Sequence, residues 1–203
     1  MDVNNEQLRR VYKLSGPDEA RDIYDEWAAS YNEDLRDMGY VGPRVAAQRL
    51  AELATPGSTV VDTGCGTGLV GAALLELKAD LILDGVDISP GMLEEARGTG
   101  AYRNLVAADL TQPLQVPDNS YDAAICVGTF TDGHLGPAGF DDLVRVVRPG
   151  GIIVATVQSQ VWEAEGFRHH LEEMTRAGTA TLREANERPY HEITCRLCVL
   201  DVP

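Results

Sequence analysis

The 203-residue sequence predicts an α/β protein with a mainly parallel sheet and helices on both of its faces. Three observations support this fold class. Strand-like and helix-like segments alternate from residue 58 to residue 177, a buried strand leads through a glycine-rich turn into a helix, and the chain ends in two strand-like segments joined by a turn. The alternation indicates βαβ units, because two parallel strands need a crossover connection between them.

Each element is predicted by its own local signal. β-branched and apolar runs bounded by turn residues predict parallel strands over 58–62, 81–87, 104–108, 121–127 and 152–157. Apolar residues at helical spacing predict helices over 18–31, 42–54, 69–77, 90–97, 140–147 and 161–177. Asp18 and Ser89 are N-cap candidates, and Gly178 ends the last helix. We expect a hairpin of 179–186 and 192–201 around a turn at 187–190, and a loose arm or short helix over 1–16.

A glycine-rich turn after the first strand indicates a ligand site. The strand ends at Asp62, and three glycines follow at alternate positions within 64–68. Glycines lack Cβ atoms, so the backbone there can turn sharply and approach a ligand, toward which the helix beginning at Leu69 directs its N-terminal N–H groups. Asp87 ends the next strand, where its carboxylate can accept from both hydroxyls of a ribose. The pattern predicts a cofactor that contains a nucleoside.

The spacing of these residues bears on which cofactor that is. The run from Gly66 to Gly71 formally matches the dinucleotide fingerprint G-x-G-x-x-G, with Asp87 at about the expected distance. Gly66 stands five residues beyond Val61, however, whereas the first glycine of a dinucleotide site follows its strand almost at once. No tyrosine has a lysine four positions later, so the catalytic pair of short-chain dehydrogenases is missing. The pattern D-x-G-x-G-x-G at 62–68 fits the strand end better, and a dehydrogenase stays a minor alternative.

With this motif and the later acid Asp109, residues 20–201 resemble the class I S-adenosylmethionine-dependent methyltransferases. The resemblance implies a Rossmann-like seven-stranded sheet of five parallel strands plus a C-terminal antiparallel hairpin, in the order 3-2-1-4-5-7-6, and S-adenosylmethionine as the cofactor. Four features are similar to the small methyltransferase-like proteins encoded in the Williams–Beuren syndrome region: the segment 24–31, the methionine-loop motif that follows the first strand, the segment 161–167 and the Pro189-Tyr190 turn. Substrates in that group are poorly defined, so the resemblance leaves the methyl acceptor open.

Each part of that cofactor has candidate residues. Backbone groups of the 64–68 loop and the following helix can bind the methionine moiety, Asp87 the ribose, and apolar side chains the adenine ring. Asp109-Leu110 resemble the family's adenine-edge motif, and the end of the fourth strand should border the sulfonium. The cofactor candidates are Asp62, Gly64, Cys65, Gly66, Asp87, Ile88, Met92, Asp109, Leu110, Val127 and Gly128. The alternatives are a surface acid for Asp87 and a loop or helix-cap acid for Asp109.

An aromatic stripe in the N-terminal segment adds three more candidates. Tyr24, Trp27 and Tyr31 are spaced three and four residues apart, so they lie on one face of a helix. The segment resembles the N-terminal helix that closes over the cofactor in small-molecule members of the family, and an aromatic ring near a sulfonium cation is favourable. Packing in the core is the alternative interpretation of the same stripe.

No general base and no metal site stand out. His134, which follows the fourth strand, is a weak candidate for the catalytic base, and His191 beside the hairpin turn is another. A base can be unnecessary, because methyl transfer from a sulfonium can proceed on positioning and desolvation. Cys195 and Cys198 have zinc-like spacing, but residues three apart on a strand face opposite sides, which favours two buried core thiols.

Composition restricts the partners. The sequence has 32 acidic and 17 basic residues, for a formal charge of −15, which disfavours nucleic acids and anionic membranes. The first six residues lack the basic and apolar regions of a signal peptide, and no apolar run approaches the length of a membrane span, so a cytoplasmic protein is expected.

We therefore expect a cytoplasmic methyltransferase that acts on an O, N or S nucleophile of a small molecule. One domain should comprise an N-terminal helical lid (1–57), a cofactor-binding core (58–157) and a final helix with the C-terminal hairpin (158–203). A protein methyltransferase and a non-catalytic module that binds S-adenosylmethionine are the alternatives. The sequence leaves the oligomeric state open.

Overall fold

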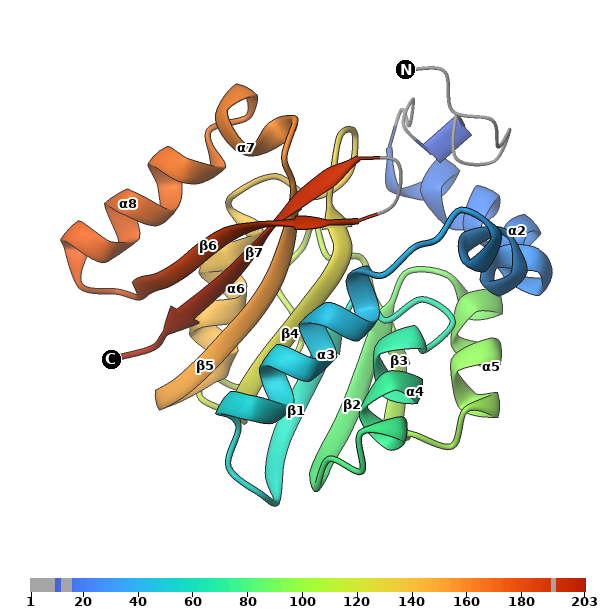
Figure 1. Cartoon of the computed structure of the whole chain (residues 1–203), viewed down its shortest axis with the longest axis horizontal. Helices are drawn as coiled ribbons and strands as arrows, with labels where there is room; N and C mark the ends of the chain where they lie inside the picture. Colours follow the sequence, from blue (N-terminus) through green and yellow to red (C-terminus); the bar gives the residue numbers. More distant parts are fainter. Residues whose placement is uncertain (1–9, 12–15, 191–192) are drawn as a thin grey trace.

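A computed structural model describes residues 10–11, 16–190 and 193–203, and a seven-stranded sheet forms its centre (Figure 1). The strands are β1 Ser58–Thr63, β2 Leu81–Asp87, β3 Tyr102–Ala107, β4 Tyr121–Phe130, β5 Val147–Gln158, β6 Thr181–Pro189 and β7 Thr194–Asp201. The helices are α2 Pro17–Asp37, α3 Gly42–Leu53, α4 Leu69–Glu76, α5 Pro90–Gly98, α6 Gly139–Val146, α7 Val161–Ala164 and α8 Phe167–Ala177.

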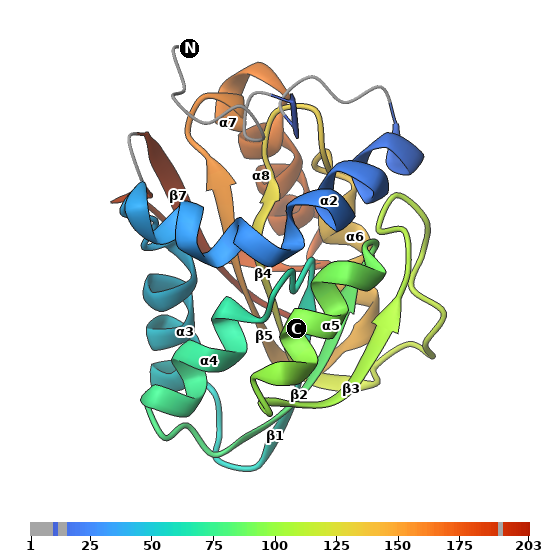
Figure 2. The same cartoon turned by 90° about the vertical axis from the view of Figure 1, so that its right-hand side faces the viewer.

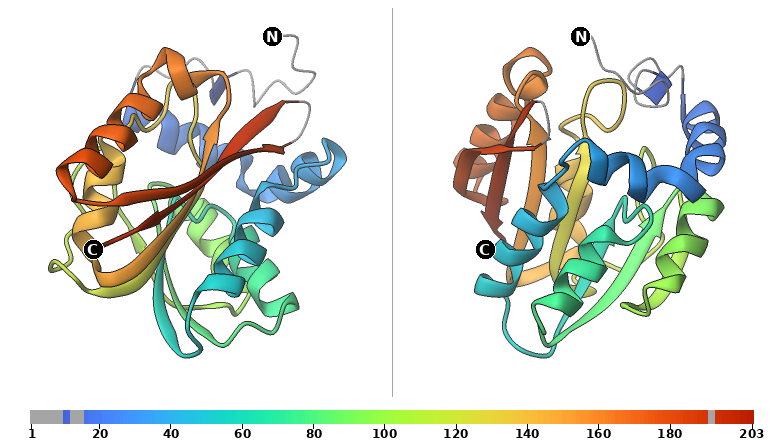
Figure 3. Two further views of the ribbon diagram at one scale, coloured as in Figure 1. Left: turned by 60° about the vertical axis from the view of Figure 1, so that its left-hand side comes forward. Right: turned by 45° about the vertical axis from the view of Figure 1, so that its right-hand side comes forward.

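The strand order β3-β2-β1-β4-β5-β7-β6 confirms the predicted fold class and topology. β1 to β5 pair in parallel, whereas β7 is antiparallel to both β5 and β6. Asp62 of β1 lies opposite Gly85 of β2 and Ile125 of β4, so the carboxyl ends of these strands meet at one edge of the sheet. Figure 3 shows the long, twisted β6–β7 hairpin at the other side of the molecule from α4 and α5.

Two apolar clusters cover the two faces of the sheet. One joins α3 and α4 to inward-facing residues of the strands, such as Val60, Ile125 and Val199. The other joins α6, α7 and α8 to the opposite face, where a stacked pair of rings, Phe130 and Phe140, lies 4.4 Å apart between centroids. Burial on both faces explains why the central strands are almost continuously apolar.

The structure corrects three details of the sequence prediction. The helix expected over 161–177 is divided into α7 and α8, because Gly166 adopts a left-handed φ of 79° between them. β6 continues through the expected turn at 187–190 and pairs as far as Pro189 with Thr194. Gly16, not Asp18, is the N-cap residue of α2, because Pro17 already occupies the first turn. The arm expected over 1–16 falls mostly outside the described residues.

The cysteine pair of β7 behaves as predicted. Cys195 shares its face with Leu197 and Val199 of one apolar cluster, whereas Cys198 belongs to the other cluster. Both thiols are buried, and no cysteine of the described chain forms a disulfide. The prediction of two core thiols on opposite faces is confirmed.

The first long helix, α2, lies across the carboxyl ends of the strands (Figure 2). The Asp25 carboxylate of α2 accepts a hydrogen bond from the Ser89 hydroxyl and another from the Gly91 N–H at 2.8 Å, both at the start of α5. The Thr67 hydroxyl of the glycine-rich loop donates to Asn32 of α2 at 2.5 Å. α2 is therefore attached to the loops at this edge of the sheet. Within the described ranges, none of the helices has the length and apolar character needed to cross a bilayer.

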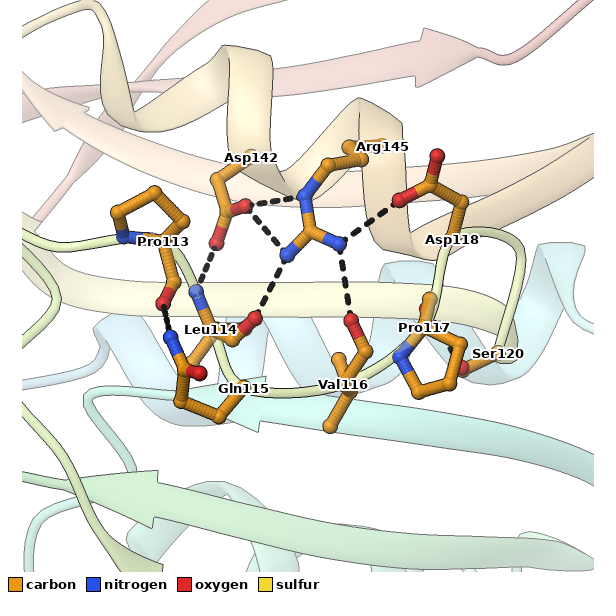
Figure 4. A network of polar contacts seen from close by, with 9 residues as sticks. All are labelled: Pro113, Leu114, Gln115, Val116, Pro117, Asp118, Ser120, Asp142 and Arg145. Atoms are coloured by element: carbon orange, nitrogen blue, oxygen red, sulfur yellow. Dashed lines mark hydrogen bonds and ion pairs between the residues drawn. The ribbon is translucent and has the colours of Figure 1, made fainter.

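The connection from β3 to β4 contains no helix in this structure and is held by a single arginine (Figure 4). The Arg145 guanidinium of α6 donates to the carbonyl oxygens of Leu114 and Val116 at 2.8 and 2.9 Å, and to the carboxylates of Asp118 and Asp142 at 2.9 and 2.7 Å. Asp142 in turn accepts from the Leu114 N–H at 2.8 Å. The planar guanidinium of Arg145 thus supports a connection that contains no crossover helix.

We expect Arg145→Lys to lower the free energy of unfolding by roughly 1–3 kcal/mol, because an ammonium cannot reach all four acceptors and leaves carbonyl groups unsatisfied. The matched control is Arg97→Lys, since Arg97 is exposed and pairs only on the surface of α5 with Glu94. The control should change the free energy by less than about 0.5 kcal/mol. Equal effects of the two variants in urea unfolding would contradict this role for Arg145.

Candidate functional site

A cavity opens at the carboxyl ends of β1, β2 and β4, with α2 as one wall. It encloses about 900 Å³ of non-atom space, a figure that includes the solvent in its open mouth. The sequence-predicted residues that line it are Tyr24, Tyr31, Gly64, Gly66, Asp87, Ile88, Met92, Asp109, Leu110, Val127 and Gly128, together with His134. The cavity thus collects residues from five separate parts of the chain.

Other residues that line the cavity were not predicted from the sequence. They are Gly16, Pro17, Ala20, Thr111, Thr129, Gly133 and Leu135. The first three begin α2, and Thr111 follows the predicted adenine-edge pair Asp109-Leu110. Gly133 and Leu135 flank His134, so the neighbourhood of a candidate base could have indicated them.

The glycine-rich loop is compressed against its neighbours. The N–H groups of Gly64 and Cys65 donate to the Val86 carbonyl at 2.8 and 3.0 Å, which binds the loop to the end of β2. Gly64 has a left-handed φ of 72°, and a Cβ at this position would collide with the Thr129 hydroxyl of β4. Only glycine meets both conditions.

Asp87 is buried at the end of β2 and faces the cavity. Its two carboxylate oxygens accept from the Gly66 N–H at 2.8 Å and from the Ser89 N–H at 3.0 Å. Burial raises the pKa of this carboxyl above its usual value, against the lowering effect of these backbone donors. The acid is oriented by the glycine-rich loop on one side and by the start of α5 on the other, so the surface-acid interpretation is wrong.

Asp62 lies beneath the loop, outside the cavity lining. One oxygen accepts from the Tyr102 hydroxyl at 2.7 Å, and the other, Oδ1, is buried without a hydrogen-bond partner among the described residues. Burial, against the opposing hydrogen bond from the Tyr102 hydroxyl and with a smaller contribution from the nearby Asp87 carboxylate, raises the pKa of Asp62 to about 7. The Cys65 side chain is also buried and does not line the cavity.

The adenine-side candidates line one end of the cavity. Met92 is almost fully buried there, beside Ile88 and Leu110. Asp109 accepts a hydrogen bond from the Thr111 N–H at 2.8 Å. The acid therefore also stabilises its own turn, which agrees with the alternative interpretation as a loop acid.

The aromatic stripe is divided between two environments. Tyr24 and Tyr31 line the cavity. Trp27 does not: it is 1% exposed, packs with Ile23 and Leu35, and donates from Nε1 to Asp34 at 2.6 Å. Trp27 instead borders a second, smaller hollow that shares Tyr24, Tyr31, Gly128 and His134 with the first. Trp27 therefore packs in the core, as the alternative interpretation had it, whereas Tyr24 and Tyr31 line the cavity.

His134 follows β4 and directly contacts Tyr24 of α2, and both side chains line the cavity. Its Nε2 lies 2.9 Å from the Tyr24 hydroxyl, and its Nδ1 lies 2.9 Å from the Thr131 hydroxyl and 3.1 Å from the Asp132 carbonyl oxygen. Burial lowers the pKa of the imidazole below its usual value. The other histidine candidate, His191, lies outside the described residues.

Comparisons with known proteins agree with this arrangement. The methyltransferase domain family matches residues 60–151. Human methyltransferase-like protein 27 is 37% identical over 172 residues, which cover 80% of this chain and 69% of that protein. The chain belongs to the S-adenosylmethionine-dependent methyltransferases.

Two further relatives of this methyltransferase extend the comparison. Demethylmenaquinone methyltransferase of Beutenbergia cavernae is 30% identical over 149 residues, which cover 72% of this chain and 61% of that protein. The crystal structure of a TehB-like S-adenosylmethionine-dependent methyltransferase from Corynebacterium glutamicum has a TM-score of 0.63 at 21% identity, over 88% of this chain and 98% of that one. The latter likeness concerns the fold alone.

The residues of the cavity fit S-adenosylmethionine, the cofactor of this family. Asp62 Oδ1 is orphaned beneath the loop and outside the cavity lining, so the backbone groups of Gly64 and Gly66, which do line the cavity, are the ones that can meet the polar groups of a methionine moiety. The buried, oriented Asp87 carboxylate suits a pair of hydroxyls, and the apolar wall around Met92 suits a purine ring. Among the residues that the structure describes, no three His, Cys, Asp or Glu side chains gather in the way a metal ion would need.

We expect Asp62→Asn to change how stability depends on pH. Because burial raises the folded-state pKa of Asp62 to about 7, the folded protein keeps a proton that the unfolded chain releases near pH 4. The free energy of unfolding therefore falls as the pH rises from about 4 to 7, by up to about 1.4 kcal/mol per unit. The amide of an asparagine does not titrate, so the variant should gain stability relative to the wild type between pH 5 and pH 8. Parallel curves for the two proteins in ligand-free urea unfolding would contradict the raised pKa.

Proposed function

We propose that this methyltransferase acts on an O, N or S nucleophile of a small molecule, which binds next to Gly128. The observation that carries the proposal is the overlap of the two hollows: the smaller one has Tyr24, Tyr31, Gly128 and His134 in common with the cavity of the cofactor candidates. A hollow enclosed by these few side chains can admit part of a small molecule, but not a folded protein or a duplex. The formal charge of −15 also disfavours nucleic acid.

We further propose how the chain holds its cofactor. Backbone groups of the loop from Gly64 to Gly68 hold the methionine moiety, with the carboxyl of Asp62 beneath that loop, and Asp87 holds the ribose. Ile88, Met92, Asp109 and Leu110 enclose the adenine. When bound, S-adenosylmethionine supplies an electrophilic methyl group on a positively charged sulfur. The neighbouring backbone of Val127 and Gly128 and the ring of Tyr24 then exclude water from that group.

The N-terminal segment 1–57 serves in this proposal as a lid on the core 58–157, and 158–203 completes the sheet. Support comes from the attachment of α2 through Asp25 and Asn32 to the loops that carry Asp87 and Gly66. Because α2 lies on the loops and contributes Tyr24 and Tyr31 to the cavity, its release would open the site.

The relatives leave a second candidate function open. The demethylmenaquinone methyltransferase is named for a small molecule, whereas a ribosomal protein L11 methyltransferase of Cupriavidus taiwanensis, 39% identical over 82 residues, is named for a protein. A protein acceptor would need an exposed groove that leads to Gly128. The kinship with the small methyltransferase-like proteins does not indicate either acceptor.

A metabolite screen tests the proposed function. The protein is incubated with isotopically labelled S-adenosylmethionine and a cell extract separated into small-molecule, protein and RNA fractions. We expect a labelled small molecule that has gained one methyl group with the wild type and not with Asp87→Ala. Label in the protein or RNA fraction alone would contradict a small-molecule acceptor, and binding without transfer to any fraction would indicate a non-catalytic module.

We expect Asp25→Ala to weaken binding of S-adenosylhomocysteine by roughly 0.5–1.5 kcal/mol, because α2 loses its hydrogen bonds to Ser89 and Gly91. The matched control is Asp22→Ala on the same helix, whose carboxylate bonds to Arg21. Calorimetry measures the affinity, and hydrogen exchange of α2 should rise only in the Asp25 variant. If Asp25→Ala lowers stability and leaves the affinity of the folded protein unchanged, α2 is a structural helix and not a lid.

A further inference from the structure

Among the residues that the structure describes, the smaller hollow has an uncharged, aromatic lining. Its rings are Tyr24, Trp27, Tyr31, Tyr40 and Tyr190, with His134 at the boundary to the larger cavity. Over the described ranges, no side chain of Asp, Glu, Lys or Arg borders it. This contrasts with the larger cavity, where Asp87 and Asp109 are part of the wall. The acceptor end of the site therefore differs chemically from the cofactor end.

This lining disfavours a charged acceptor. A buried carboxylate or phosphate requires a cation or several donors, and burying either without them is unfavourable. The aromatic rings would attract a protonated amine, but such an amine would lie next to the sulfonium, itself a cation, and would lack the lone pair that attacks the methyl carbon. Aromatic side chains instead favour a flat, apolar molecule: the Tyr40 and Tyr190 rings already pack edge to face, with their centroids 4.8 Å apart.

The hydrogen bonds of His134 leave one ring nitrogen as an acceptor toward Tyr24. Of the two groups near Nδ1, the Thr131 hydroxyl at 2.9 Å can donate or accept, whereas the Asp132 carbonyl oxygen at 3.1 Å can only accept; a proton on Nδ1 suits both contacts, and we assign it there. Nε2 then accepts from the Tyr24 hydroxyl at 2.9 Å. Burial keeps the imidazole neutral near pH 7 by lowering its pKa, and the Asp132 backbone and carboxylate oppose this effect only in part. The pair is thus a phenol that donates to a neutral base.

We propose that the acceptor is an uncharged phenol, and that its hydroxyl proton passes through Tyr24 to His134 Nε2; this rests on the proposed function. The acceptor oxygen forms a bond to the methyl carbon while the carbon–sulfur bond breaks and leaves its electron pair on sulfur. The acceptor proton moves to Tyr24 Oη, and the Tyr24 proton moves to His134 Nε2. The positive charge lost from sulfur is the charge that the imidazolium gains, so the net charge of the site stays constant. Solvent later removes the proton from His134.

The strength of the base explains why a phenol is favoured over an aliphatic alcohol. Phenols lose a proton near pH 10, whereas water does so near 15.7, about six units higher. A neutral imidazole with a lowered pKa is too weak a base to deprotonate a hydroxyl as weakly acidic as that of water or an aliphatic alcohol. The hydroxyl of Tyr24 shows that a phenol is a suitable hydrogen-bond partner for Nε2 at this position.

Three para-substituted phenols test the charge preference without any reaction. Calorimetry in the presence of saturating S-adenosylhomocysteine compares p-cresol with its anionic analogue 4-hydroxybenzoate and its cationic analogue tyramine. We expect p-cresol to bind at least tenfold more tightly than either analogue. Binding of a charged analogue as tightly as p-cresol, or no binding of p-cresol, would overturn the proposal. Failure of S-adenosylhomocysteine itself to bind would instead contradict the proposed function.

Two variants test the proton route. His134→Gln and Tyr24→Phe should keep their affinity for S-adenosylhomocysteine and p-cresol within about threefold, yet lower methyl transfer to p-cresol by roughly 100-fold and 10-fold. Nitrogen chemical shifts of the four histidines, assigned with His134→Gln, should show the Nδ1–H tautomer at His134 and a change at Nε2 in Tyr24→Phe. Unchanged transfer rates in folded variants, or an Nε2–H tautomer, would overturn the relay.

Discussion

The turn between β1 and α4 is the constraint on which the rest of the site depends. Its backbone must pass between the end of β2 and Thr129 of β4, and it does so with two N–H groups on the Val86 carbonyl and a third, from Gly66, on Asp87. Because Asp87 also accepts from Ser89, the same acid connects the turn to α5. The Gly91 N–H at the start of α5 in turn donates a hydrogen bond to the Asp25 carboxylate of α2. The cavity wall on this side is therefore one connected hydrogen-bond network.

The network places two buried acids close together, which is unfavourable for the fold alone. Burial raises the pKa of both Asp62 and Asp87, and each carboxylate that stays ionised there lacks a cationic partner in the described part of the chain. In a region where apolar residues of the same size would pack well, such an arrangement is typical of a functional site. A diol bound to Asp87, the acid that lines the cavity, gives its buried carboxylate further hydrogen-bond donors, so ligand binding and stability should be coupled here.

The sequence predicted the features that depend on local pattern, and missed those that depend on distant contacts. The strand before Asp62, the glycine turn and the cap at Ser89 each follow from residue type and spacing, and all are found in the structure. The contact of Tyr24 with His134 joins residues 110 positions apart, and no periodicity could indicate it. For the same reason, spacing alone could not separate Trp27, which is buried, from Tyr24 and Tyr31, which line the cavity. The support of the β3–β4 connection by Arg145 is likewise a tertiary contact.

The most direct test of the central claim is a calorimetric titration of the wild type, Asp87→Ala and Asp80→Ala with S-adenosylhomocysteine and with NAD. Asp80 is exposed before β2 and serves as the matched control. The account predicts that the wild type binds S-adenosylhomocysteine far better than NAD, and that Asp87→Ala weakens this binding by roughly 1.5–3 kcal/mol while Asp80→Ala leaves it unchanged. Comparable affinity for NAD, or unchanged binding by a folded Asp87→Ala variant, would contradict it.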